Sequence, residues 1–99
     1  MKIEILDEAQ EDLIEGFSFY EKIEAGVGYY FLDCIFSDID SLILFAGIHP
    51  IVYGYHRSLS KRFPFAIYYD VEGEVVRVHA ALDCRKNPAW IRKRLTKRG

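Results

Sequence analysis

Four cationic side chains stand where they could bind an anion. Arg57, Lys61 and Arg62 flank the start of the aromatic segment 63–69, and Arg85 follows the next predicted strand. Guanidinium and ammonium groups bind phosphates and carboxylates through charge-assisted hydrogen bonds. Arg57 shares its predicted strand face with apolar residues, where an unpaired cation is costly, so we expect a functional role for it. The neighbouring aromatics could stack on bases, but large aromatics in strands mostly pack, and we expect them in the core.

Arg85 and the histidines complete the set of candidates. Arg85 could form an anion site with the start of the last predicted helix, or it could pair with Asp83, and the sequence favours neither. His56 and His79 have no carboxylate nearby in the sequence and His49 lies in a predicted loop, so we expect structural or surface roles for all three. His, Cys and acidic residues nowhere cluster at metal-ligand spacing, and we expect neither a metal nor a cofactor.

The net charge of the chain is only −2, but its two halves carry opposite charges. Residues 1–50 carry eleven acids and two bases, a charge of −9, and residues 51–99 carry eleven bases and four acids, a charge of +7. The halves could attract each other in the fold, or one basic face could bind an anionic partner. The basic run in the last predicted helix, which includes Arg92 and Arg94, is open to the same two interpretations.

The first half has the pattern of one strand followed by two helices. Residues 2–6 alternate polar and apolar side chains and predict a strand. Asp7 can cap a first helix, which Gly26 and Gly28 end, and the apolar spacing predicts a second helix over 29–45. A short loop with glycine between two such helices is typical of an antiparallel helical hairpin.

The second half has a period of two. It predicts strands over 52–59, 65–71 and 75–83, with a turn at Glu72–Gly73 that makes the last two a hairpin. In the last strand, alternation predicts one shared face for four apolar residues, namely Val76, Val78, Ala80 and Leu82. Asn87 and Pro88 are typical of an N-cap and a first helical position, and open a short basic helix.

These elements predict an α+β fold with the order β-α-α-β-β-β and a short C-terminal helix. We expect one domain over 1–99, in which the helical hairpin packs on one face of an antiparallel sheet and the other face is free. No apolar run is long enough to span a membrane. The first residues do not resemble a signal peptide, so we expect a cytoplasmic protein with Cys34 and Cys84 as reduced thiols.

Several segments together resemble the RelE/ParE superfamily of toxins. The most specific is Arg-Phe-Pro-Phe-Ala-Ile-Tyr-Tyr at 62–69. It is accompanied by Arg-Ser-Leu at 57–59, Val-Arg-Val-His-Ala-Ala-Leu-Asp at 76–83 and Arg-Lys-Asn-Pro-Ala-Trp at 85–90. The N-terminal Ala-Gln-Glu-Asp-Leu at 9–13 fits the helical hairpin of the same toxins. The order of elements derived above agrees with the fold of that superfamily.

The resemblance implies the toxin of a type II toxin–antitoxin (plasmid stabilization) system, neutralised by a cognate antitoxin that wraps it as helix and strand. One branch cleaves mRNA in the ribosome, and the residues that match its cationic set are Arg57, Lys61, Arg62 and Arg85. The C-terminal Tyr of that branch has no counterpart here, because Trp90 and Ile91 occupy the region. The other branch, ParE-like, poisons DNA gyrase, and the Asn-Pro-Ala-Trp ending is closer to it.

We therefore expect growth inhibition through gyrase, with an mRNA endonuclease or a non-toxic binding module as the alternatives. The acidic balance of the chain counts against entry into the ribosome, since attraction to RNA favours positive charge. The residues that we expect to contact the target or the antitoxin are Arg77, Trp90, Arg92 and Arg94. Operator DNA would be bound only through the antitoxin, and an isolated chain could form a homodimer through its exposed sheet face.

Overall fold

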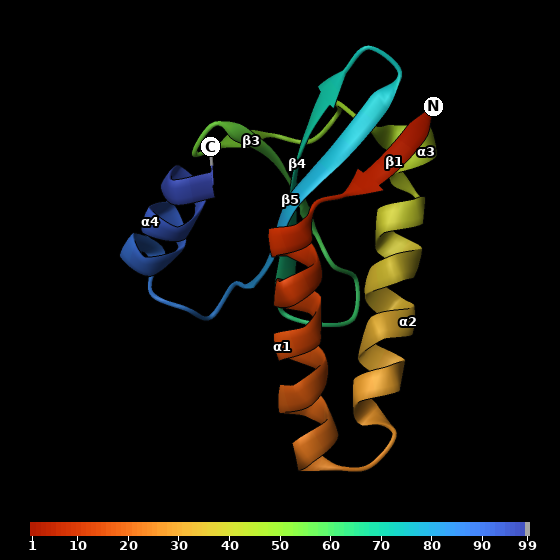
Figure 1. The fold of residues 1–99 in the computed structure, drawn as a ribbon, viewed down its shortest axis with the longest axis vertical. Coiled ribbons are helices and arrows are strands. Elements are labelled where there is room, and N and C mark those ends of the chain that lie inside the picture. Colours follow the sequence, from red (N-terminus) through yellow and green to blue (C-terminus); the bar gives the residue numbers. More distant parts are fainter. Residues whose placement is uncertain (99) are drawn as a thin grey trace.

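The fold is a five-stranded sheet with helices on both faces (Figure 1). The computed structural model describes residues 1–98. Its elements are, in chain order, β1 (Lys2–Ile5), α1 (Asp7–Ile23), α2 (Val27–Asp40), α3 (Leu42–Phe45), β2 (Ile51–Val52), β3 (Tyr55–Leu59), β4 (Phe65–Glu72), β5 (Val75–Asp83) and α4 (Pro88–Arg98). This arrangement confirms the predicted α+β class and order of the main elements. Among the described residues, no helix is both long and apolar enough to cross a bilayer.

The sheet is mixed, whereas the sequence predicted an antiparallel one. Its strand order is β1-β5-β4-β3-β2, and β1 pairs with β5 in parallel while the other neighbours are antiparallel. The prediction was wrong for β1 because this strand is not joined to its neighbour by a hairpin. The chain leaves β1 through the helices and enters the sheet again at β2, on the opposite edge, so no short turn fixes the direction in which β1 pairs.

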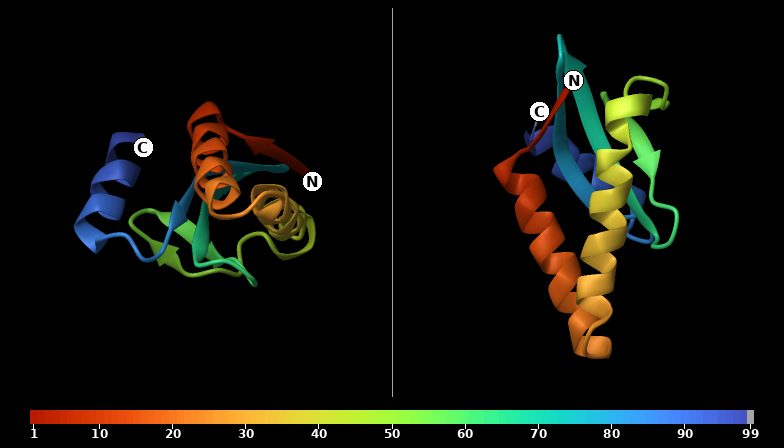
Figure 2. Two further views of the ribbon diagram at one scale, coloured as in Figure 1. Left: turned by 90° about the horizontal axis from the view of Figure 1, so that it is seen from below. Right: turned by 90° about the vertical axis from the view of Figure 1, so that its right-hand side faces the viewer.

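The helical hairpin of α1 and α2 covers one face of the sheet (Figure 2). The Glu21 carboxylate fixes the connection, since it accepts hydrogen bonds from the backbone N–H groups of Gly26 at 3.0 Å and Gly28 at 2.9 Å. Gly28 also allows the helices to approach closely, because a Cβ there would lie 2.7 Å from the Phe17 carbonyl oxygen. The predicted hairpin is therefore confirmed, with Gly26 at its turn and Gly28 inside the first turn of α2.

Two predicted boundaries inside this region were wrong. The helix predicted over 29–45 begins earlier, at Val27, and ends at Asp40, and a separate single turn, α3, follows. The break coincides with Ser41, whose hydroxyl donates a hydrogen bond of 2.6 Å to the Asp38 carbonyl, a pattern that bends helices. Asp7 lies inside the first turn of α1, with Leu6 at the N-cap position.

The strand predicted over 52–59 is two strands joined by a tight turn. Tyr53 and Gly54 have φ angles of +52° and +89°, so the chain reverses there and β2 pairs back onto β3. Two consecutive residues with positive φ are typical of a two-residue hairpin turn. The sequence signal was missed because Tyr-Gly lacks the Asn or Asp that usually marks such a turn.

A β-bulge in β5 changes which residues face which side. Tyr68 lies opposite Ala80 and Tyr69 lies opposite Val78, so His79 has no partner in the register. Beyond the bulge the alternation is reversed, and the predicted common face of the four apolar residues was wrong. Two residues before the bulge, Val76 and Val78, pack toward the helical hairpin, and two after it, Ala80 and Leu82, pack toward α4.

The second face of the sheet is not free, contrary to the prediction, because α4 covers part of it. Ile91 and Leu95 of α4 pack into a small core with the apolar residues of that face, which are Tyr55, Ala66, Tyr68, Ala80 and Leu82. The predicted start of this helix is confirmed, since Asn87 Oδ1 accepts a hydrogen bond of 2.8 Å from the Ala89 N–H. The short apolar stripe of α4 was hidden in the sequence by its many cations.

Candidate functional site

Arg57 is one of the four cations predicted as catalytic, and it lies on the face of the sheet that α4 covers. It lies half-buried on β3, directly opposite Tyr68 of β4. No acidic side chain of the described residues forms a salt bridge with it. Burial raises the pKa of Tyr68 and of the Cys84 thiol, and the positive charge of Arg57 opposes both shifts. Arg57 therefore presents an uncompensated positive charge beside a phenol and a thiol.

Arg85 is engaged with Asp83, which is one of the two interpretations that the sequence left open. Its Nε and Nη2 donate to the two carboxylate oxygens of Asp83 at 3.0 and 2.8 Å, and its backbone N–H donates to Oδ1 at 2.8 Å. These hydrogen bonds hold the pKa of Asp83 below its usual value, although burial acts in the opposite direction. Arg85 thus closes the turn after β5, and its charge is largely neutralised.

Lys61 and Arg62 lie in the loop between β3 and β4, on the side of α2. With Asp33, Cys34, Ser37 and Asp38 they line a shallow cleft of about 330 Å³. Asp38 is buried and holds this loop by accepting a hydrogen bond of 2.7 Å from the Ser60 hydroxyl. The four predicted catalytic cations are therefore not gathered around one point, because Arg57 faces the α4 side and these two face α2.

The residues predicted to contact the target or the antitoxin, and the other cations of α4, divide into those that form salt bridges and those that form none. Arg77 pairs with Asp70 at 3.1 Å and with Glu72 at 2.7 Å on the β4–β5 hairpin. Arg94 lies 3.6 Å from both Asp12 and Glu15 of α1, and its guanidinium stands over the Trp90 ring at 4.9 Å. Three cations of α4 are exposed and form no salt bridge within the described chain, namely Arg92, Lys93 and Lys97.

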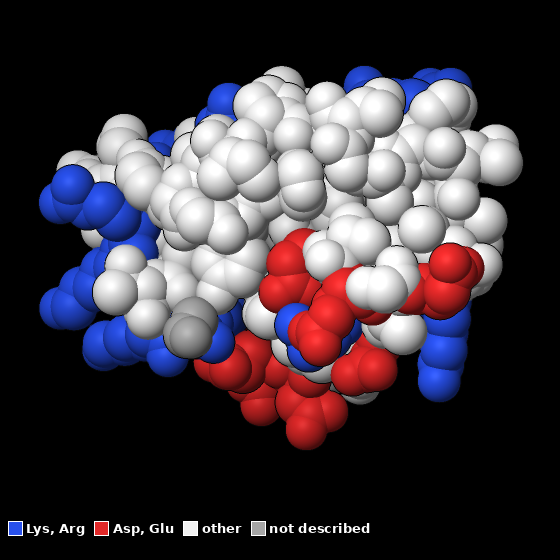
Figure 3. All heavy atoms as spheres, turned by 90° about the horizontal axis from the view of Figure 1, so that it is seen from above, with Lys and Arg blue, Asp and Glu red and all other residues white. Residues whose placement is uncertain are grey.

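The two oppositely charged halves do attract each other, through α1 and α4. Arg98 is buried against Asp12, with its Nη2 donating to Oδ1 at 2.8 Å, and its Nε lies 3.3 Å from Glu8. A second row of cations, Arg92, Lys93 and Lys97, still faces outward, so the pairing between the halves leaves part of the positive charge of α4 exposed. Figure 3 shows a group of Lys and Arg side chains at one edge, Asp and Glu side chains beside it, and a broad uncharged surface over much of the view.

One pair of side chains was missed by the sequence reasoning. His79 Nε2 lies 2.9 Å from Asp70 Oδ2, although the two residues are nine positions apart. Burial acts to raise the pKa of Asp70, but the hydrogen bonds from Arg77 and His79 outweigh it and leave this pKa lowered. The turn at Gly73 was the available signal, because it sets Asp70 opposite Arg77 in the hairpin. No group of three or more His, Cys, Asp or Glu in residues 1–98 could hold a metal ion.

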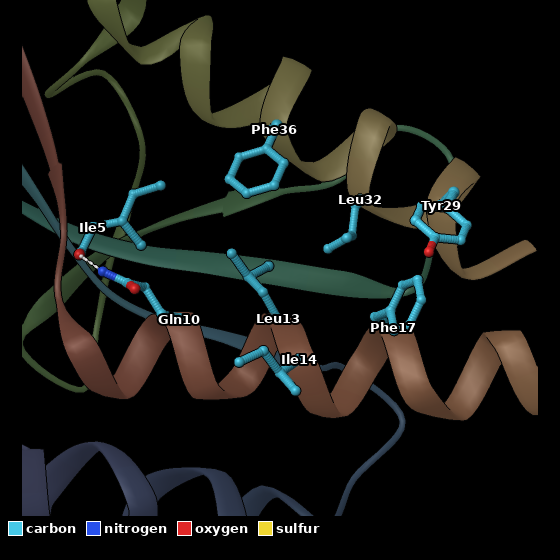
Figure 4. A pocket seen from close by; sticks show the side chains of 8 residues that line it. All are labelled: Ile5, Gln10, Leu13, Ile14, Phe17, Tyr29, Leu32 and Phe36. Carbon is cyan, nitrogen blue, oxygen red and sulfur yellow. Dashed lines mark hydrogen bonds between the residues drawn. The ribbon is translucent and has the colours of Figure 1, made fainter.

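An apolar groove runs between α1 and α2, and it was not predicted (Figure 4). It measures about 410 Å³ and begins at the end of β1, where Gln10 Nε2 donates to the Ile5 carbonyl at 2.8 Å. The other residues that line it are Leu13, Ile14, Phe17, Tyr29, Leu32 and Phe36. Ile14 and Tyr29 are 63% and 64% exposed, so large apolar side chains remain open to solvent along its length. Such a groove has the shape and chemistry that accept the apolar face of a helix from another protein.

The fold is shared with a chain of a solved toxin–antitoxin structure, described as the chromosomal ParDE TA system from P. aeruginosa. The two chains superpose with a TM-score of 0.72 over 82% of this chain and 92% of that one, at 17% sequence identity. No protein-family model matches the sequence, and no curated protein matches it either. The likeness confirms the fold that the resemblance to RelE/ParE toxins implied, and at this identity it carries the fold alone.

Proposed function

We propose that this chain is the toxin of a type II toxin–antitoxin pair, and that it inhibits growth by poisoning DNA gyrase. The observation that carries the proposal is the fold in common with a chain of a ParDE system over most of both chains. The preference for a protein target rests on the cations. Arg85 is paired with Asp83, and Lys61 and Arg62 face away from Arg57, so they do not converge on one phosphate.

The surface that we propose to contact gyrase is the outer side of α4 and its surroundings. Arg92, Lys93 and Lys97 offer positive charge there, while Trp90 is 37% exposed with the Lys86 ammonium 5.5 Å from its ring centre. Aromatic and Arg side chains together are typical of the residues that contribute most to protein interfaces. Arg94 lies beneath this surface and orients Trp90. Arg77 is bound by two acids, and we propose that it supports the sheet.

The antitoxin, in this proposal, lays an amphipathic helix into the groove between α1 and α2. Leu13 and Phe17 form the floor of the groove, and the exposed Ile14 and Tyr29 would be covered by the bound helix. The free edge of β1 begins beside the same groove and can accept a strand from that partner. Operator DNA would then be bound by the antitoxin. We propose that the chain acts in the cytoplasm, where DNA gyrase is found. The free thiols of Cys34 and Cys84 agree with that reducing compartment.

The proposal is tested with purified gyrase and plasmid DNA. The wild-type chain should block ATP-dependent supercoiling and trap cleaved DNA, and the triple variant Arg92→Glu/Lys93→Glu/Lys97→Glu should do so much less. Those three side chains are exposed, so the variant should fold, and circular dichroism checks this. An intact supercoiling activity, combined with ribosome-dependent cleavage of mRNA, would instead establish the endonuclease. Inactivity in both assays would favour a non-toxic binding module.

A further inference from the structure

A second apolar surface lies on α3 and β2, away from the groove between α1 and α2. Residues 41–56 contain no Asp, Glu, Lys or Arg. Six large apolar side chains of this segment are between 45% and 80% exposed, and we call them the α3–β2 patch: Ile43, Leu44, Phe45, Ile48, Ile51 and Tyr53. None of them lines the groove between α1 and α2.

Tyr69, His49 and His56 form hydrogen bonds that fix the loop between α3 and β2. The Tyr69 hydroxyl accepts a hydrogen bond of 2.9 Å from the Gly47 N–H and shares another with His49 Nδ1. His56 donates to the His49 carbonyl at 2.8 Å and stacks on the Tyr69 ring. Burial lowers the pKa of His49, which disfavours the charged form of the ring. The patch is therefore preorganised and uncharged, which reduces the entropy lost on binding.

The size of the patch indicates a protein partner. Monomeric proteins rarely expose contiguous apolar surfaces beyond a few hundred Å². Six side chains with these exposures offer an area of the order of the ~800 Å² that each partner of a stable complex buries. A single exposed Leu would need no explanation, but Leu44, Ile48 and Ile51 together do.

Charge decides which partner fits. In a two-fold dimer the same surface meets itself, so any charge on it faces an equal charge. The acidic side of α1, with Glu8, Glu11 and Glu15, would repel its own copy, and so would the basic side of α4. The α3–β2 patch carries no such charge, and it has nothing with which to select an acidic or basic partner.

We propose that two copies of this chain associate through the α3–β2 patch. This interface differs from the sheet face expected from the sequence, part of which α4 covers. The residues of the patch and of the groove do not overlap, so the dimer leaves the groove for a different occupant. The inference does not depend on the proposed gyrase target, because it concerns the surface of the free chain.

The test is sedimentation velocity of the full chain over a range of concentrations. The wild-type chain, with a monomer mass of 11.5 kDa, should approach twice that mass as concentration rises. Leu44→Arg should weaken the dimer at least ~100-fold, because a two-fold contact would bury two unpaired charges. Ile23→Arg is the matched control, since Ile23 is 64% exposed but lies at the far end of α1, and it should dimerise like the wild type.

Circular dichroism and thermal unfolding establish that both variants are folded. A wild-type chain that remains monomeric at every concentration would overturn the proposal and leave the patch to another protein. A dimer that persists unchanged in Leu44→Arg would also overturn it, because association would then use a different surface. Equal weakening by Leu44→Arg and Ile23→Arg would have the same meaning.

Discussion

Arg98, at the end of α4, binds Asp12 in the middle of α1, with Arg98 Nη2 2.8 Å from Asp12 Oδ1. Both side chains are almost fully buried. Asp12 Oδ2 also accepts the backbone N–H of Ala81 at 3.0 Å, directly after the bulge at His79. One carboxylate therefore joins the helical hairpin, the sheet and the last helix, and it fixes the position of the helix that carries the proposed gyrase surface.

Replacing Asp12 should destabilise the whole chain. Asp12→Ala leaves the Ala81 N–H without an acceptor and the Arg98 guanidinium with only Glu8 and the His79 carbonyl, so we expect a loss of about 3–5 kcal/mol in the free energy of unfolding. Urea unfolding followed by circular dichroism measures it. Glu11→Ala, an exposed neighbour on the same helix, is the control and should change stability by less than ~0.5 kcal/mol. Equal effects of the two variants would show that Asp12 does not hold the fold together.

A charged side chain in the groove between α1 and α2 should prevent neutralisation by the antitoxin and leave toxicity unchanged. Ile14→Arg places a charge among apolar side chains at an exposed position, so we expect the variant to fold and to inhibit growth. It should no longer be rescued by the antitoxin, which can be isolated by selecting genomic fragments that permit growth when the wild-type chain is induced. Ile23→Arg, at a similarly exposed position outside the groove, should still be rescued. Rescue of Ile14→Arg would place the antitoxin elsewhere.

Arg57 discriminates between the two branches of toxin. If the target is gyrase, Arg57→Ala should reduce inhibition less than about tenfold, because the contact is spread over many residues. If the chain cleaves mRNA, the same variant should lose about 10²–10³-fold in rate, since a charge at the scissile phosphate acts in the transition state. Dose–response curves for growth arrest measure the difference. Lys22→Ala, an exposed cation outside both sites, serves as the reference.

Stability should decrease below neutral pH because of His49. Burial first, and the nearby His56 second, lower the pKa of His49 in the folded chain. The unfolded chain, with a pKa near ~6.5, then binds more protons, so stability is lost as the pH falls below that value toward the folded pKa. Unfolding measured from pH 7 downward should show this slope, and His49→Asn should flatten it. An identical slope in the variant would assign the effect to another group.

The sequence identified the elements where local signals were strong. The Asn87–Pro88 start of α4 and the glycine at 26 between the two helices of the hairpin carry their own backbone chemistry, and both were predicted correctly. The Tyr53–Gly54 turn and the bulge at His79 were not predicted. A Tyr can adopt positive φ only when the rest of the sheet stabilises it, and a bulge depends on the neighbouring strand.

The candidate site was predicted less well, because charge pairing is a property of the tertiary structure. Arg57 was chosen for its apolar strand face, and its place beside Tyr68 on that face agrees with this. For Arg85 the sequence allowed two interpretations, and the structure shows the salt bridge with Asp83 that one of them predicted. Nothing in the sequence indicated that Arg98 would reach Asp12 across 86 positions, or that Ile14 and Tyr29 would line an open groove.

The most direct test of the proposed function is pulse-labelling in bacteria after the chain is induced alone. Thymidine and amino-acid incorporation are followed over time in the same cultures, with the triple variant of α4 as the control. The gyrase proposal predicts that DNA synthesis falls first while translation continues, and that the variant delays the fall. A collapse of protein synthesis before DNA synthesis would contradict it and point to the ribosome, with Arg57 as the first residue to replace.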